Sequence, residues 1–99
     1  MKVETIEQFR NLVLTLGLPR TDVVLFGVIC PYCGKNDRVR PLDPPEELKV
    51  EELGETNIDL YDRIWRELQP GESLAVCKFC HNILQLQGGD QKGIPLYEL

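Results

Sequence analysis

The sequence has very little of several residue types on which particular functions depend. Its 99 residues include one histidine and one methionine. With a single histidine available as a general base, the sequence shows no catalytic set of a nucleophile, a base and a group that orients the base. No stretch approaches the roughly 20 consecutive apolar residues of a membrane-spanning helix. Residues 1–8 carry two acids and no apolar run typical of a signal peptide. We therefore expect a cytoplasmic protein that is not an enzyme and has no membrane partner.

Basic residues are also scarce, because 11 Lys and Arg face 16 Asp and Glu and the formal net charge is −5. Residues 43–72 alone hold ten acids and three bases. An acidic chain is poorly suited to non-specific contacts with phosphate, so nucleic acid is a disfavoured partner. The apolar fraction of 42% and the charged fraction of 27% are those of an ordinary folded domain. We expect one domain, residues 1–99, whose partner is another protein.

The four cysteines form two C-x-x-C pairs, Cys30 with Cys33 and Cys77 with Cys80. In a reducing compartment such pairs bind metal or carry out redox chemistry more often than they form disulfides. Zinc prefers four thiolates in a tetrahedron, and a two-residue gap lets both sulfurs of a pair reach one ion. We predict one structural zinc ion per chain, held by all four cysteines. Because more than forty residues separate the pairs, such an ion couples metal binding to folding.

Residues 30–34 read C-P-Y-C-G and resemble the knuckle of the zinc-ribbon and rubredoxin-like superfamily, in which two β-knuckles grip one ion. The resemblance covers about residues 24–40 and 73–87, and its motifs occur in proteins of very different function. It implies a metal centre without indicating a particular family. Iron bound as in rubredoxin uses the same four thiolates, so the sequence does not separate it from zinc. The second pair is followed by His81 instead of glycine, which leaves the geometry of that turn less certain.

Hydrophobic periodicity predicts two helices outside the knuckles. A capping box begins a run of apolar residues at helical spacing, which gives an N-terminal helix over about 5–16. An acidic and helical insert, about 43–69, contains a second apolar stripe that follows a cap at Thr56 or Asn57. Prolines and many acids make residues 46–55 a loop or a short exposed helix.

Strands are predicted on both sides of each cysteine pair. A β-branched and aromatic run at 22–29 leads into the first knuckle, about 22–40, and the second knuckle occupies about 73–87. We expect an α+β fold in which two knuckle hairpins form a small antiparallel, zinc-ribbon-like sheet with both helices on one face. Residues 90–99 form a tail whose apolar side chains either pack back on the domain or dock elsewhere.

A thiol oxidoreductase is one alternative, because residues 23–33 are similar to the active-site strand and C-P-Y-C motif of glutaredoxins. That resemblance implies that Cys30 is the attacking thiolate. In glutaredoxins the second cysteine lies in a long helix, for which Gly34 and the prolines that follow leave no room here. This alternative also leaves Cys77 and Cys80 without a role.

A c-type haem is a second alternative, because residues 77–81 satisfy the C-x-x-C-H motif with His81 as the axial ligand. That motif is specific only in an exported protein, and a haem there would leave the first cysteine pair idle. We therefore expect no haem, and we expect His81 to be an ordinary residue of the second knuckle.

A nucleic-acid-associated zinc ribbon is a further alternative. Its contacts would come from the cations that flank the two knuckles, namely Lys35, Arg38, Arg40 and Lys78. The same four cations also offset the charge of −2 that one zinc ion and four thiolates carry together. Their presence therefore fits either a nucleic-acid surface or a neutralised metal centre.

Overall fold

The computed structural model of the chain describes residues 3–18, 23–87 and 92–96. Helices and an antiparallel sheet both occur, so the predicted α+β class is confirmed. Within the described ranges no helix combines the length and the apolar character needed to cross a bilayer. The elements are, in chain order, α1 Val3–Leu16, β1 Val39–Pro41, the 3-10 helix η1 Pro45–Glu47, α2 Val50–Leu53, α3 Glu55–Arg66, β2 Ser73–Cys77, β3 Ile83–Gln87 and β4 Lys92–Pro95.

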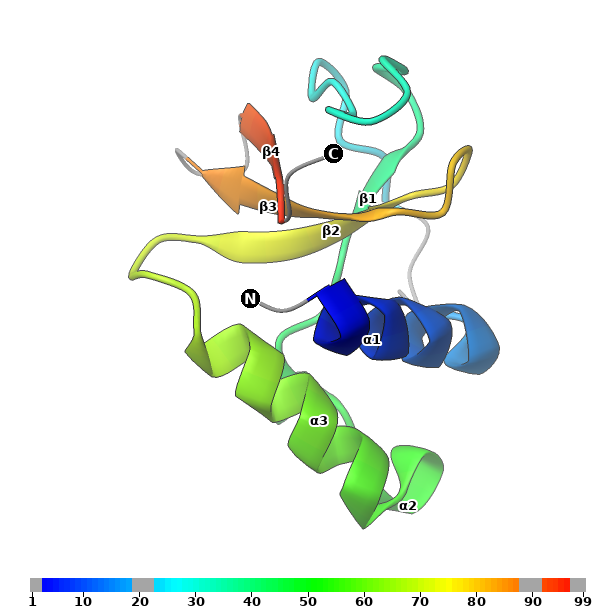
Figure 1. Cartoon of the computed structure of the whole chain (residues 1–99), viewed down its shortest axis with the longest axis vertical. Helices are drawn as coiled ribbons and strands as arrows, with labels where there is room; N and C mark the ends of the chain where they lie inside the picture. Colours follow the sequence, from blue (N-terminus) through cyan, green and yellow to red (C-terminus); the bar gives the residue numbers. More distant parts are fainter. Residues whose placement is uncertain (1–2, 19–22, 88–91, 97–99) are drawn as a thin grey trace.

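The sheet runs in the order β1-β2-β3-β4, and every neighbouring pair is antiparallel. Figure 1 shows α1 and α3 on one side of the β2–β3 ribbon and the segment that precedes β1, coloured cyan, on the other side. The register pairs Val39 with Cys77 and Val76 with Ile83. Because side chains alternate along a strand, this register divides the buried residues of the sheet between two faces.

The helix-facing side of the sheet carries the larger core. Leu74, Val76 and Ile83 point to this side and pack with the apolar stripes of α1 and α3. The rings of Phe9 in α1 and Tyr61 in α3 lie 5.1 Å apart between their centroids. Both predicted helices therefore cover the same face of the sheet, as the apolar stripes of their sequences indicate.

The opposite face of the sheet carries a second core, which lies beneath the cysteines. Its buried members are Val28, Cys30, Val39, Ala75, Cys77, Leu84 and Leu86. The first cysteine of each pair thus belongs to a packed apolar layer as well as to the metal-binding motif. This layer connects the sheet to the two knuckles, so the position of the sulfurs depends on the packing of the strands.

The strand predicted at 22–29 is wrong for the part that the structure describes. Residues 23–29 are irregular and turn at Gly27, whose φ of 85° is in the left-handed region that glycine tolerates. The N–H of Leu25 donates to the carbonyl of Val39 at 3.0 Å. Because of this turn, no regular ladder forms between residues 23–29 and β1, which pairs with β2 instead. The apolar run divides into the buried Val28 and the exposed Ile29.

The tail predicted at 90–99 contains a strand, because β4 pairs along β3. Gly93 and Pro95 are disfavoured in strands, which hides this one in the sequence. Proline is tolerated here because β4 is the last strand in the sheet order. Leu96 packs against the larger core, whereas Tyr97 lies outside the described residues.

The start of α3 also differs from the prediction. The residue at its N-cap is Gly54, and no side chain caps the first turn. Asn57 lies inside the helix, where its side-chain amide donates to the carbonyl of Leu53 at 2.8 Å. The amide thus joins α3 to the end of α2, and the cap predicted at Thr56 or Asn57 is wrong by two or three residues.

Candidate metal centre

The four cysteine sulfurs converge on one point between the two knuckles. The Sγ atoms of Cys30 and Cys80 are 3.6 Å apart, and so are those of Cys33 and Cys77. All four sulfurs lie within 4.8 Å of one another. A tetrahedron with zinc–sulfur bonds of about 2.3 Å has sulfur–sulfur edges of about 3.8 Å. The four cysteines are therefore positioned to hold one metal ion, and each close pair joins one knuckle to the other.

The turn of the first knuckle is fixed by two backbone hydrogen bonds. The N–H of Cys30 donates to the carbonyl of Lys35, and the N–H of Gly34 donates to the carbonyl of Cys30, both at 2.9 Å. Gly34 adopts a φ of 80°, which a residue without a Cβ atom reaches at little cost. These bonds bend the chain so that the sulfurs of Cys30 and Cys33 face the same side.

The second knuckle repeats this pattern with a different residue at the turn. The N–H of Cys77 donates to the carbonyl of Asn82 at 3.0 Å, and the N–H of His81 donates to the carbonyl of Cys77 at 2.8 Å. His81 is the sole non-glycine residue with positive φ among those described, at 62°, and its side chain is exposed. Histidine tolerates this backbone region better than most residues do. The second turn, whose geometry the sequence left uncertain, therefore has the same hydrogen-bond pattern and the same positive φ as the first turn.

Burial separates the two cysteines of each pair. Cys30 and Cys77 are buried, whereas Cys33 and Cys80 are half-buried. The buried cysteines sit in the second core, and Cys77 is the last residue of β2, opposite Val39 of β1. Strand β2 thus fixes the sulfur of Cys77, and packing in the second core holds that of Cys30. The turns bring the second sulfur of each pair to the surface side of the cluster.

The environment of the two buried sulfurs, those of Cys30 and Cys77, opposes ionisation when no cation is present. Burial raises the pKa of Cys30 to about 12, although backbone N–H groups of Cys33 and Tyr32 favour its thiolate. Burial likewise raises the pKa of the Cys77 thiol. For Cys33, burial is outweighed by the N–H of Lys35 and by the neighbouring thiols, and the pKa is lowered. A bound dication would reverse this balance, since a coordinating thiol is deprotonated outright.

Tyr32 ties the first knuckle to the far strands of the sheet. Its hydroxyl donates to the carbonyl of Ile83 at 2.8 Å and accepts from the N–H of Leu96 at 2.9 Å. The sequence contained no signal for this role beyond a tyrosine between two predicted ligands. The contact means that residue 32, inside the metal-binding turn, also holds the chain at the end of β4.

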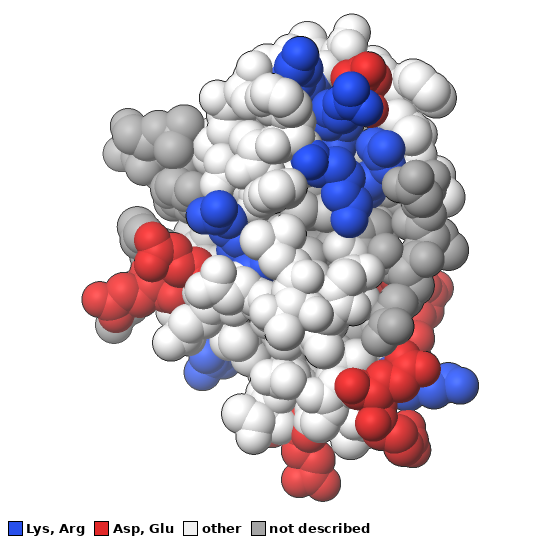
Figure 2. Space-filling view, turned by 90° about the vertical axis from the view of Figure 1, so that its right-hand side faces the viewer, with Lys and Arg blue, Asp and Glu red and all other residues white. Residues whose placement is uncertain are grey.

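The four cations predicted beside the knuckles do not have equal exposure. Arg40 is buried, and its guanidinium donates to the carbonyl of Asp37 at 3.4 Å. The side chain of Arg38 is half exposed and lies 3.8 Å from the carboxylate of Asp37. Lys35 places its ammonium 4.9 Å from the ring centroid of Phe79. Figure 2 shows Lys and Arg gathered at the upper end of one face, with most acids of that face at its lower end and margins.

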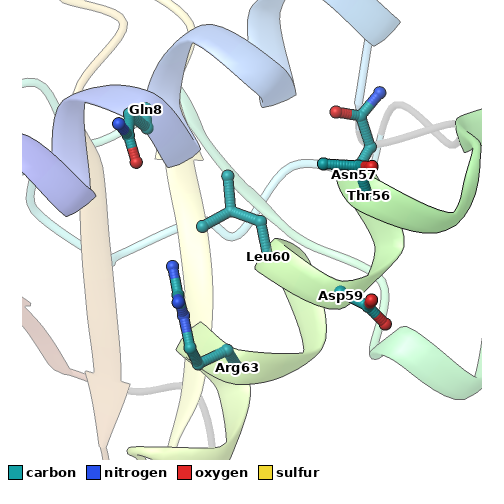
Figure 3. A pocket seen from close by; sticks show the side chains of 6 residues that line it. All are labelled: Gln8, Thr56, Asn57, Asp59, Leu60 and Arg63. Atoms are coloured by element: carbon teal, nitrogen blue, oxygen red, sulfur yellow. The ribbon is translucent and has the colours of Figure 1, made fainter.

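A concave region lies away from the cysteines, between α1 and α3. This open groove has a volume of about 400 Å³, and its lining residues are Gln8, Thr56, Asn57, Asp59, Leu60 and Arg63. Figure 3 shows Leu60 and Arg63 extending from α3 towards α1, whereas Asp59 points away from the groove. The groove therefore offers amides, one hydroxyl and one guanidinium, without a carboxylate or thiol aimed at a common point.

The arrangement of Cys33 bears on the glutaredoxin-like alternative. Cys33 lies in a turn, where the glutaredoxin resemblance implies a long helix. Its sulfur is 3.6 Å from that of Cys77, a residue that the redox alternative leaves unused. The geometry thus groups all four cysteines, as one metal site requires.

Comparisons of the chain with models of known protein families, with curated proteins and with solved structures found no match. The resemblance of residues 30–34 to a zinc-ribbon knuckle is therefore carried by the motif and by the matching turns alone. The function is therefore inferred from the chemistry of the sulfur cluster and of the surface around it.

Proposed function

We propose that the protein is a small, non-catalytic zinc-binding interaction module in which Cys30, Cys33, Cys77 and Cys80 hold one structural zinc ion. The observation that carries the proposal is the cluster of four sulfurs within 4.8 Å of one another. Four thiolates fill a tetrahedral zinc ion and leave no open position for water or substrate. The ion then acts as a cross-link between the two knuckles.

A structural role for the ion is also supported by its place in the fold. The two knuckles approach each other through the sulfurs, while their strands belong to one sheet. Structural zinc ions contribute about 10–16 kcal/mol of apparent binding free energy in zinc-finger peptides. The net stability of a small domain is only about 5–15 kcal/mol. Loss of the ion is therefore expected to unfold this protein or leave it without fixed tertiary packing.

The interaction role is supported by the surface beside the cysteines. Ile29 and Phe79 are 59% and 58% exposed, and each immediately precedes a cysteine of the cluster. Exposed apolar side chains that gather in one place often mark a docking surface. A metal centre that fixes two such side chains in position suits a module that presents them to a larger partner.

A nucleic-acid-associated ribbon is the second candidate, and the basic cluster of Figure 2 is the observation that favours it. Lys35, Arg38 and Lys78 are exposed near the knuckles, although Arg40 is buried. Three exposed cations in a chain of net charge −5 provide few phosphate contacts. Binding of this kind would weaken steeply as salt is raised, which distinguishes it from docking to a protein.

The proposed metal centre is tested by elemental analysis of protein purified without chelators. We expect about one zinc ion per chain, and the same measurement separates zinc from iron. Removal of the ion with a chelator should abolish the near-ultraviolet circular dichroism of the aromatic core, and added zinc should restore it. A chain that carries no metal, or that keeps its tertiary signal after the metal is removed, contradicts the proposal.

A further inference from the structure

We infer that the knuckle end of the molecule binds a segment of a partner protein that has apolar anchor residues flanked by acidic residues. The inference rests on the proposed zinc centre, because the ion would hold the two knuckles together. We call the surface concerned the knuckle face, and its residues are Ile29, Lys35, Arg38, Lys78 and Phe79.

The apolar part of the knuckle face comes from two distant parts of the chain. Ile29 adjoins Cys30 and Phe79 adjoins Cys80, and the sulfurs of these cysteines are 3.6 Å apart. Ile29 and Phe79 therefore flank the same metal centre from opposite knuckles, and both are more than half exposed. The arrangement provides two anchor sites whose separation the sulfur cluster fixes.

The segment before the first knuckle extends this apolar character. Phe26, the most exposed large apolar residue of the described chain, is 81% exposed, and Val23 is 52% exposed. Figure 1 shows this segment, coloured cyan, at the end of the molecule opposite α2. Outside the knuckles and this segment, the exposed large apolar residues among those that the structure describes are Leu14 and Val50. Exposed apolar surface is thus concentrated at the knuckle end, as expected of a docking site.

Cations lie directly beside the apolar residues. The ammonium of Lys35 stands 4.9 Å from the ring centroid of Phe79. The backbone N–H of Lys78 donates to the carbonyl of Arg38 at 2.8 Å, so the backbones of these two basic residues are neighbours across the knuckles. The ammonium of Lys78 lies 3.5 Å from the carbonyl oxygen of Leu18, at the edge of this surface. An acidic partner segment would be attracted to this cluster and repelled by the acids that Figure 2 shows towards the other end. The charge distribution therefore selects both the kind of partner and its point of approach.

The same residues suit a protein segment better than nucleic acid. A surface for single-stranded nucleic acid uses free aromatic rings for base stacking and enough cations for several phosphates. Here Lys35 already lies over the ring of Phe79, and Ile29 presents an aliphatic side chain that cannot stack on a base. Aliphatic and aromatic side chains at the centre with cations around them match the hot-spot pattern of protein interfaces. Apolar anchors with acidic flanks are the complementary sequence.

The test is a selection of random displayed peptides on the immobilised, zinc-loaded protein. We expect the enriched peptides to carry large apolar residues flanked by Asp or Glu. A fluorescein-labelled peptide of the enriched sequence should then bind about tenfold more weakly to Phe79→Ser, to Ile29→Ser and to Lys35→Glu. Matched controls at the far end, Val50→Ser and Lys49→Glu, should retain the affinity, since both side chains are exposed there.

Several outcomes would overturn the docking inference. Among them are no enrichment, enrichment of neutral or basic peptides, and equal losses in the control and knuckle-face variants. Submicromolar binding of fluorescein-labelled oligouridine at about 150 mM salt, weakened by Arg38→Glu, would replace the inference with the nucleic-acid candidate. Zinc content and near-ultraviolet circular dichroism are measured for every variant. A protein without zinc contradicts the proposed function itself, whereas a zinc-loaded and folded protein that enriches no acidic–apolar peptide contradicts the docking inference alone.

Discussion

Gly34 and His81 occupy equivalent positions in the two knuckles. Each follows the second cysteine of its pair and donates its N–H to the carbonyl of the first, at 2.9 and 2.8 Å. Their φ angles are 80° and 62°. A residue with a Cβ atom pays about 1–2 kcal/mol for this left-handed conformation, so the second knuckle carries a local strain that the first does not.

The first prediction concerns these two positions. Gly34→Val should lower the free energy of unfolding of the zinc-loaded protein by about 1–2 kcal/mol or more. His81→Val should lower it by a smaller amount, because histidine already bears the cost of a Cβ atom at positive φ and only the additional cost of a β-branched side chain is added. His81→Gly should change it by less than about 1 kcal/mol, since relief of strain is offset by the larger entropy of unfolded glycine. Denaturant titration measures all three. If His81→Val were as stable as the parent protein, the equivalence of the two turns would be disproved.

The second prediction concerns the number of metal ions. Cys30→Ser and Cys77→Ser should damage folding to a similar extent, because each removes a ligand from the same ion. The double variant should be little worse than either single variant, since residues that serve one site are not additive. Zinc content and tertiary circular dichroism are the measurements. Additive losses, or a Cys77→Ser protein that keeps its zinc and its fold, would show that the pairs act separately.

The metal site could be predicted from the sequence because its signal is local. A two-residue gap between cysteines restricts both sulfurs to one turn, and the chemistry of thiolates limits what such turns do. The backbone pattern at Gly34 was equally visible, as only glycine reaches positive φ without cost. The role of Tyr32 was hidden, because its two partners, Ile83 and Leu96, are separated from it by more than fifty residues.

The helices were predictable because their hydrophobic periodicity follows burial, and the strands of the second knuckle were predictable from their residue types and their position beside the cysteines. The stripe of α1 buries Phe9 and Val13 against the sheet, and the helix lies within two residues of its predicted start. In contrast, residues 23–29 have strand-like composition but turn at Gly27, and tertiary packing overrides their propensity. β4 was not predicted, because its residues lack strand propensity and tertiary packing places them in the sheet. Its position beside β3 depends on a close approach to Leu84 and to the backbone of Ile29, which requires Gly93.

The third prediction tests that close approach. A Cβ atom at residue 93 would lie 2.8 Å from Cδ1 of Leu84 and 2.9 Å from the carbonyl oxygen of Ile29. Gly93→Ala should therefore lower the free energy of unfolding by about 1–3 kcal/mol, as overpacking of a core does. Lys49→Ala, at an exposed position, is the control and should be nearly neutral. A Gly93→Ala protein with unchanged denaturant midpoint would mean that the segment before the first knuckle does not pack on β4.

The fourth prediction concerns the hydroxyl of Tyr32, which joins the carbonyl of Ile83 to the N–H of Leu96. Tyr32→Phe keeps the ring and leaves both backbone groups without that partner, at a cost of about 1–3 kcal/mol. Zinc content should stay the same, because the ring is not a ligand. Amide hydrogen exchange should speed up at Leu96 while the N–H of Val76, in the interior strand β2, keeps its protection. Unchanged exchange at Leu96 would show that Tyr32 does not hold the end of β4.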